Sequence, residues 1–331
     1  MSVNDSLLVV VLAQAVLYGT PLLYAALGEL LAERSGVLNL GVEGMMLFGA
    51  AFGYWVTQEV HGSDAAVLPL AVLGAAVPGA AMAAIHAFLT ITMRASQIVS
   101  GLALTIFAGG LGLSAYFGTE LHLADKTATH QLGSINVFGL RSVPVLGPVL
   151  FDQPALVYAS WGLTLAVALY LTRTRWGLNV RAVGEAPASA DAMGIAVARY
   201  RYVHVLAGGA LAGVGGACYS LSITPGWVAG DTLVNGAGWI AIALVIFSFW
   251  RAELCLAGAY LFGGLSALPF ALQANEELQH LPAGVLRTPE PYQALPYVLT
   301  IAVLVVVSTT FAKRRLGAPA ALGTPYVREE R

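Results

Sequence analysis

The sequence has too little charge for a water-soluble protein. Only 10% of its 331 residues are charged and 58% are hydrophobic, whereas an ordinary soluble domain has roughly a quarter of its residues charged. So few charged side chains cannot cover a soluble body of this size, but a bilayer needs no such cover and penalises charge near its centre. The composition therefore predicts an integral membrane protein with many spans.

Lysine, cysteine and phosphate-binding motifs are also scarce. Lys126 and Lys313 are the only lysines and the net charge is -2, so the basic patch that a nucleic-acid binder needs is missing. Cys218 and Cys255 lie in apolar runs without metal-binding or disulfide spacing, which favours plain packing. No Gly-Lys-Ser/Thr sequence occurs, so this chain has no P-loop with which to hydrolyse ATP itself.

Motifs of enzymes and metal sites are missing as well. The sequence contains no nucleophile elbow and no metal-binding His/Glu signature, and we identify no paired carboxylates. His86 and His204 are lone histidines near the inner ends of spans, without a second ligand at helical spacing. We expect no catalytic residue, no metal site and no cofactor bound by this chain.

Nine apolar runs are candidates to cross the roughly 30 Å hydrocarbon core, which takes about 17–25 residues as a helix. The first is too long for the apolar region of a signal peptide and has no basic residues before it. The seventh is short and is expected to pair with the eighth as a hairpin with residues 250–253 at its tip. The runs are Leu7–Leu31, Gly36–Trp55, Val67–Ile91, Ile98–Gly118, Ala155–Leu171, Tyr202–Ile223, Gly238–Trp250, Glu253–Leu272 and Leu295–Phe311.

The basic residues predict the orientation, because cytoplasmic loops keep an excess of Lys and Arg. With the C-terminus inside, alternation of nine spans places all basic residues inside except Lys126, Arg141 and Arg287. The fold class is therefore an all-α integral membrane protein of about nine transmembrane helices, N-terminus out and C-terminus in. Residues 1–331 form one transmembrane domain with an extracytoplasmic loop at 119–153, a cytoplasmic loop at 172–201 and a cytoplasmic tail at 312–331.

Two loops and two glycine pairs carry local signals. Loop 119–153 contains stretches in which polar and apolar residues alternate, so small strands or a surface helix are expected there. In loop 172–201, Pro187 suits the first turn of a helix and Gly194 suits the left-handed position after its end, which predicts a short cytoplasmic helix. Gly49 with Gly53, and Gly209 with Gly213, have the spacing that lets membrane helices pack closely.

Polar residues inside the second span predict a broken or re-entrant helix. Within residues 35–44, Asn39, Glu43 and several glycines interrupt an otherwise apolar span. Irregular backbone at membrane depth must be buried in protein or line a wet cavity. Glu43 and Asn39 either bond the broken backbone or a neighbouring helix, or contact the solute. Glu29 and Glu33 are expected to be interfacial charges that fix helix ends.

Other polar and aromatic residues could line a translocation path, with helix packing as the alternative for each. The candidates for the path are Asn39, Glu43, Ser100, Thr105, Ser220 and Trp239. Further polar or aromatic positions of the same kind are Gln14, Tyr18, Ser222, Thr224, Trp227 and Asn235.

Several motifs together resemble one family. Residues 33–46 (ERSGVLNLGVEGMM) and 177–187 (GLNVRAVGEAP) look like signatures of permease subunits of ABC importers for nucleosides and simple sugars, a family that also holds the ribose, galactose and branched-chain amino acid permeases. Asn39 stands where ribose-type relatives carry an aspartate, and residues 247–253 lack the prolines and glycines expected there. The motifs that resemble the nucleoside-type branch are 238–244, 261–263, 295–300 and 323–326.

The resemblance implies partners and an energy source. A cytoplasmic ATP-binding subunit would bind ATP and Mg, a homologous second permease would complete a heterodimer, and an extracytoplasmic solute-binding protein would deliver a nucleoside or related neutral solute. The location would be the plasma membrane of a bacterium or archaeon. A simple sugar or branched-chain amino acid is the alternative solute, and a self-contained carrier or channel using Glu43 is the rival function. The residues that would contact the ATP-binding subunit are Arg181, Gly184, Glu185, Pro187, Ala190 and Gly194.

Overall fold

The computed structural model describes residues 6–110, 113–123, 125–227, 233–273, 294–307 and 317–327. Almost all secondary structure in this part of the chain is helical. The helices are α1 (Leu7–Arg34), α2 (Val42–Glu59), α3 (Asp64–Ala87), α4 (Gln97–Thr105), α5 (Leu113–Glu120), α6 (Ala155–Arg173), α7 (Arg175–Glu185), α8 (Pro187–Ala192), α9 (Val197–Cys218), α10 (Ala237–Phe247), α11 (Ala252–Gln273) and α14 (Leu295–Val307). Short π-helical segments continue α3, α4 and α9; they are η2 (Phe88–Thr92), η3 (Ile106–Gly110) and η6 (Tyr219–Ile223).

Five helices in the described residues are long and apolar enough to cross a membrane, which confirms the prediction of a helical membrane protein. Two shorter apolar helices, Gln97–Gly109 and Ala237–Phe247, match the fourth and seventh predicted runs. The ninth run is described as α14 up to Val307. Its last residues, Arg287 and tail residues 312–316 and 328–331 lie outside the described residues. The five long helices are Leu7–Arg34, Asp64–Thr92, Ala155–Arg173, Val197–Ile223 and Ala252–Ala271.

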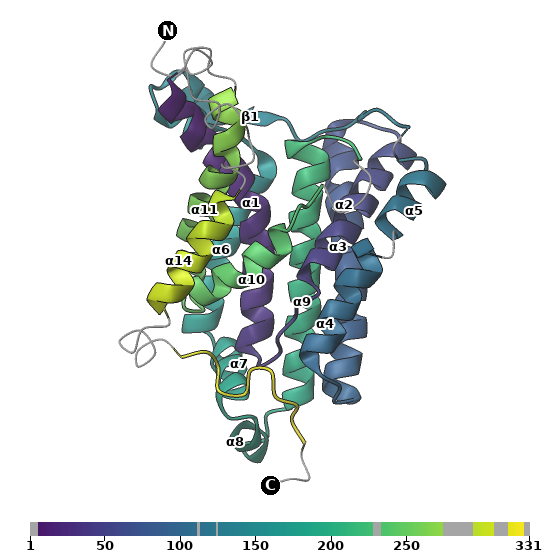
Figure 1. Cartoon of the computed structure of the whole chain (residues 1–331), viewed down its shortest axis with the longest axis vertical. Helices are drawn as coiled ribbons and strands as arrows, with labels where there is room; N and C mark the ends of the chain where they lie inside the picture. The colour runs from purple at the N-terminus through teal and green to yellow at the C-terminus, as the bar shows by residue number, and fades with distance from the viewer. Residues whose placement is uncertain are drawn as a thin grey trace.

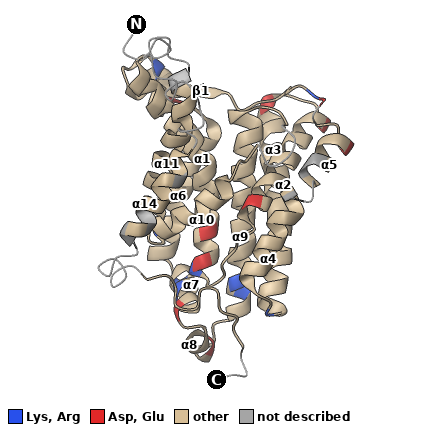
Figure 2. Cartoon of the chain, in the orientation of Figure 1, with Lys and Arg blue, Asp and Glu red and all other residues tan. Residues whose placement is uncertain are grey.

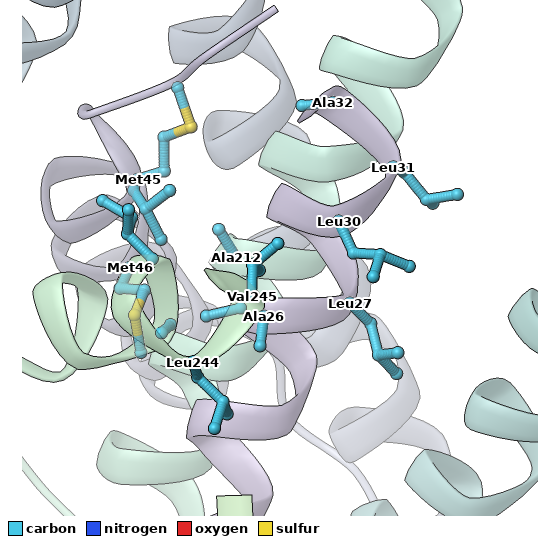
Figure 3. Close-up of a cluster of buried hydrophobic side chains, with 14 of the residues drawn as sticks. Ala26, Leu27, Leu30, Leu31, Ala32, Met45, Met46, Ala212, Leu244 and Val245 are labelled. Atoms are coloured by element: carbon cyan, nitrogen blue, oxygen red, sulfur yellow. The ribbon is translucent and has the colours of Figure 1, made fainter. Parts of the chain in front are cut away.

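Helix α9 lies at the centre and packs against α1, α2 and α3, while α11 packs on the other side of α1 (Figure 1). The core between these helices is formed by aliphatic and methionine side chains. Figure 3 shows Ala26 of α1, Met46 of α2 and Val245 of α10 converging in it. All three are fully or almost fully buried, so α10 is part of the packed interior although it is short.

Glycine contacts hold the central helices together. A Cβ atom on Gly49 of α2 would fall on the backbone of Gly213 in α9, and Gly28 of α1 is in the same relation to Gly208. Gly209 and Gly213 face the backbone of α3 in the same way. The predicted close packing at Gly49, Gly209 and Gly213 is confirmed, because only a residue without a side chain lets these backbones approach so closely.

The two ends of the molecule differ in structure. The N-terminus and β1 lie at one end, and α7, α8 and the C-terminus lie at the other, which we call the α7–α8 end (Figure 1). In loop 119–153, β1 (Ser134–Asn136) pairs antiparallel with β2 (Asp152–Pro154), so the small strands predicted there are present. Figure 2 shows the charged residues mainly at these two ends, with a few acidic segments in α1 and α2 between them.

Candidate functional site

The chain between α1 and α2 is not helical, so the predicted break in the second span is confirmed. Residues 35–41 separate Arg34, where α1 ends, from Val42, where α2 begins. Helix α2 therefore starts six residues after Gly36, the predicted start of that span. Backbone groups left unpaired in such a segment must find partners within the protein.

Side chains of α1 and α4 supply several of those partners. The backbone N–H of Asn39 donates to Glu29 Oε1 of α1 at 2.8 Å, and that of Leu38 donates to Gln97 Oε1 of α4 at 2.7 Å. The Leu40 carbonyl accepts a 2.9 Å hydrogen bond from the Thr105 hydroxyl. These bonds fix the course of the break, and they show Thr105 in a structural contact.

His86 joins the same network from α3. Its Nε2 lies 3.0 Å from the Leu38 carbonyl oxygen, and its Nδ1 lies 3.0 Å from the Ser100 hydroxyl. His204 likewise bonds the hydroxyl of Tyr170 and the carbonyl of Tyr200, at 2.8 and 2.6 Å. Among the described residues no cluster of three His, Cys, Asp or Glu side chains that could hold a metal occurs.

Glu43 connects this break to a second one. Its two carboxylate oxygens accept backbone N–H bonds from Gly236 at 2.9 Å and from Gly238 at 2.6 Å. These groups belong to the start of α10, where Asn235 and Gly236 are left-handed with φ of 49° and 82°. A carboxylate at a helix N-terminus satisfies unpaired N–H groups and interacts favourably with the helix dipole. Glu43 thus bonds a neighbouring helix; its contact with a solute stays a prediction.

Glu29 and Glu33 fix the end of α1, as expected, but from inside the protein; their interfacial position stays a prediction. Both side chains are buried, at 2% and 1% exposure, and the two carboxyl groups interact one turn apart on α1, so a carboxylate pair exists that we did not identify in the sequence. Glu33 accepts a hydrogen bond from the indole N–H of Trp250. Burial is tolerated because residues 35–41 and the turn before α11 cover these acids and donate to them.

Arg34 completes this arrangement from the end of α1. Its Nη2 and Nε donate to the Trp250 carbonyl at 2.8 and 3.2 Å. Phe249 and Trp250 both have left-handed backbone, in the predicted hairpin turn between α10 and α11. Trp250 is therefore held on both its side chain and its carbonyl by the last turn of α1.

A cavity of about 210 Å³ lies between α1, η6, α10, α11 and α14. Three predicted polar or aromatic positions line it: Tyr18, Thr224 and Asn235. Sequence reasoning missed Tyr219, Ser266 and Phe270, which lie within continuous apolar runs and give no separate signal. The complete lining is Tyr18, Leu22, Tyr219, Ile223, Thr224, Leu233, Val234, Asn235, Ala237, Ile240, Ser266, Pro269, Phe270 and Pro296.

None of the six candidates for the path is among the lining residues. Asn39, Ser100 and Thr105 surround the break, and the Ser220 hydroxyl donates to the Ala50 carbonyl at 2.9 Å. Glu43 binds the start of α10, and Trp239 is 39% exposed. Their part in translocation remains a prediction.

The predicted short helix in loop 172–201 is present as α8. It begins at Pro187, ends at Ala192 and is followed by Gly194 with φ of 82°. The preceding helix α7 is capped by Thr174, whose hydroxyl accepts the Gly177 N–H at 3.0 Å. The two helices form a small unit at the α7–α8 end with its own apolar cluster of Val183, Ala190 and Val197.

The six residues predicted to contact the ATP-binding subunit differ in exposure. Glu185 and Gly194 are exposed and Arg181 and Pro187 are half-buried, whereas Gly184 and Ala190 are buried within this chain. A Cβ atom on Gly184 would fall on the Arg34 carbonyl oxygen, so this glycine lets α7 approach the end of α1. The largest exposed apolar side chains of this unit are Trp176, Leu178 and Met193, at 55%, 58% and 82%.

The described part of the C-terminal tail lies against this unit. The Ala321 N–H donates to the Gly184 carbonyl at 2.9 Å, and the Ala320 N–H donates to Glu185 Oε2 at 3.2 Å. Tyr326 packs on the cluster formed by Val183, Ala190 and Val197. The sequence predicts a cytoplasmic tail here, with the motif at 323–326, but not its contact with α7 and α8, because small and polar residues carry no packing signal.

Comparison with known proteins agrees with this architecture. Residues 11–308 match the family described as branched-chain amino acid transport system / permease component. A putative glucose ABC transporter permease protein of Haloferax volcanii is 41% identical over 94% of this chain and 95% of its own length. A guanosine ABC transporter permease protein of Bacillus subtilis is 34% identical over 98% of both chains. A nucleoside ABC transporter permease protein of Lactococcus lactis is 32% identical over the full length of both.

Each of these organisms also has a second matching permease protein. The second proteins are 30%, 27% and 25% identical to this chain in Haloferax volcanii, Bacillus subtilis and Lactococcus lactis. The family match covers most of the chain, and the relatives cover nearly all of it. The chain therefore belongs to this permease family and is a transmembrane permease component of an ABC transporter, a multi-pass protein of the plasma membrane.

Proposed function

We propose that this chain forms part of the translocation path of an ABC importer for a nucleoside or related small neutral solute. The observation that carries the proposal is the α7–α8 unit, which presents exposed apolar side chains next to the end of α1. Exposed side chains such as Met193 suit insertion into a groove of an ATP-binding subunit. ATP and Mg would be bound by that subunit, and this chain would bind no cofactor.

A continuous series of contacts leads from this unit to the cavity. Gly184 of α7 lies against the Arg34 carbonyl, and Arg34 holds the Trp250 carbonyl at the end of α10. The start of α10 lines the cavity and is held by Glu43. We propose that displacement of α7–α8 by the ATP-binding subunit is carried along this series to α10. Contact alone does not establish coupling, which has to be measured by substitution.

The proposed orientation has nine spans, the N-terminus outside and the α7–α8 end in the cytoplasm. Most of the described arginines support it, because they belong to helix ends and loops that meet at the α7–α8 end. An excess of basic residues marks the cytoplasmic side. These arginines are Arg34, Arg94, Arg173, Arg175, Arg181, Arg199, Arg201 and Arg251.

The partners and the solute are inferred from the relatives. Pairs of permease proteins in three organisms support a heterodimer of this chain with a homologous second permease. Two of the three most similar proteins named above carry nucleoside or guanosine in their names, which favours a nucleoside. The third, a putative glucose permease protein, makes a simple sugar the second candidate, and a branched-chain amino acid is the third.

Reconstitution tests the function directly. The chain is purified with its second permease and ATP-binding subunit, placed in liposomes, and supplied with the solute-binding protein and labelled guanosine, glucose or leucine. We expect guanosine uptake only when ATP is present on the side of the ATP-binding subunit. Uptake by this chain alone, without ATP, would instead establish a self-contained carrier or channel.

A further inference from the structure

The cavity beside α10 is lined by both aromatic rings and polar groups. We infer that it binds the transported solute and selects an uncharged nucleoside, with the base on the aromatic rings and the polar edges on hydroxyl and amide groups. This inference rests on the proposed function. The residues that would make these contacts are Tyr18, Tyr219, Thr224, Asn235, Ser266 and Phe270.

The cavity is a partly open hollow of about 210 Å³ rather than an enclosed void. It is bordered by the π-helical end of α9 and by the left-handed turn before α10. Interrupted helices of this kind line binding sites in membrane proteins, because their irregular backbone needs a polar or protein environment.

Aromatic rings form one part of the wall. Tyr18 of α1 and Phe270 of α11 stack with ring centroids 5.8 Å apart and an angle of 23° between their planes. Both rings line the cavity. Every nucleobase is flat and can stack on an aromatic ring. This wall therefore favours a nucleobase over a solute without a planar ring.

Unused hydrogen-bonding groups form another part. Within the described chain, no hydrogen bond joins the side chains of Thr224, Asn235 or Ser266 to another protein group. The Asn235 amide offers both a donor and an acceptor, and its position is fixed by the neighbouring Gly236 N–H, which donates to Glu43. Polar groups facing a cavity need a partner from water or from a ligand.

The described part of the lining is poorly suited to a charged solute. None of the fourteen described residues around the cavity is an acid or a base. Glu43 is not among these lining residues, and both of its carboxylate oxygens accept N–H groups of Gly236 and Gly238. A free amino acid would bring an ammonium and a carboxylate into this space, where neither finds an opposite charge. An uncharged nucleoside avoids that cost.

The test uses the complete transporter in liposomes, with its solute-binding protein and labelled guanosine. Phe270→Leu keeps an apolar side chain but removes the ring, and Asn235→Gly removes the amide while still accepting left-handed backbone. We expect each variant to raise the KM for guanosine uptake by roughly tenfold or more, the effect of one lost stacking or hydrogen-bonding contact.

Phe88→Leu is the matched control, because Phe88 is a 51% exposed aromatic residue of η2 that does not line the cavity. Its KM should equal that of the wild type. If the wild type takes up guanosine with ATP but every cavity variant does so with unchanged KM, the cavity is not the binding site, although the proposed function stands. ATP-driven uptake of glucose or leucine without guanosine uptake overturns the nucleoside assignment itself.

Loss of assembly is distinguished from loss of binding by size-exclusion chromatography of each complex. Ser266→Ala is a third, smaller change that removes one hydroxyl from the cavity wall. With assembly intact, a raised KM in this variant supports the site. An unchanged KM in all three variants overturns it.

Discussion

Glu43, in the first turn of α2, accepts the backbone N–H of Gly238, in the first turn of α10, at 2.6 Å, although 195 positions separate them in the sequence. Glu43 follows the non-helical residues 35–41, and Gly238 follows the left-handed turn before α10, so this bond joins two non-helical segments. A Cβ atom on Gly238 would lie 2.5 Å from the Glu43 backbone nitrogen, which leaves room there only for glycine.

Replacement of Glu43 tests this connection. Glu43→Gln keeps one acceptor but places an NH₂ group against a backbone donor, and hydrogen bonds to a charged group are worth about 1.5–3 kcal/mol each. We expect a loss of about 2 kcal/mol in stability and slower transport, measured by thermal unfolding in detergent and by uptake. Glu59→Gln is the control, since its exposed ion pair with Lys126 should contribute about 0–1 kcal/mol.

The close helix packing predicts a sharp dependence on glycine at the centre. Gly213→Val places a branched side chain on the backbone of α3, and overpacking costs about 1–3 kcal/mol or more where backbone must move. We expect most of this variant to aggregate when the detergent extract is examined by size-exclusion chromatography. Gly162→Val should elute like the wild type, because nothing lies within 4 Å of a Cβ atom on Gly162 in α6.

The exposed side chain of Met193 predicts where the ATP-binding subunit docks. Met193→Asp puts a charge on the apolar surface of the α7–α8 unit, so co-purification with that subunit should fall at least roughly tenfold, the effect of about 1.4 kcal/mol. Phe138→Asp is the control at the opposite end, where Phe138 is 89% exposed. If Met193→Asp and Phe138→Asp both co-purify with the ATP-binding subunit as well as the wild type does, docking at α8 is contradicted.

The tail predicts an effect on coupling rather than on folding. Deletion of residues 317–331 removes the hydrogen bonds to the Gly184 carbonyl and the Glu185 carboxylate and the packing of Tyr326 on Val183. We expect the complex to assemble but to lose most solute-stimulated ATP hydrolysis, because α7 and α8 are no longer held in one position. Gly317→Ala, at a site with nothing within 4 Å, should hydrolyse ATP like the wild type.

Local patterns predicted the helices better than the contacts between them. The start of α8 at Pro187 and the left-handed Gly194 follow from backbone preferences of single residues, so they were predictable. The break after Arg34 was predictable from Asn39 and the surrounding glycines. Its partners were not, because Gln97, His86 and Thr105 are distant in sequence and only the packing of α3 and α4 brings them together.

The acids of α1 and the cavity show the limit of such reasoning. Glu29 and Glu33 stand at a helix end next to Arg34, which is typical of an interfacial position, yet the break and the Trp250 turn bury them. Tyr18 and Phe270 lie in separate apolar helices and become a pair only when α11 packs on α1. A single sequence does not reveal which faces of apolar helices meet.

The contact of Ala321 with Gly184 has a consequence for biosynthesis. A ribosome makes residues 317–327 after every helix from α1 to α14, so α7 and α8 emerge long before the segment that holds them. During that interval the unit lacks its bonds to the tail, and premature binding of an ATP-binding subunit would meet an incomplete surface. Joining of the two subunits would then follow completion of the permease rather than accompany its synthesis.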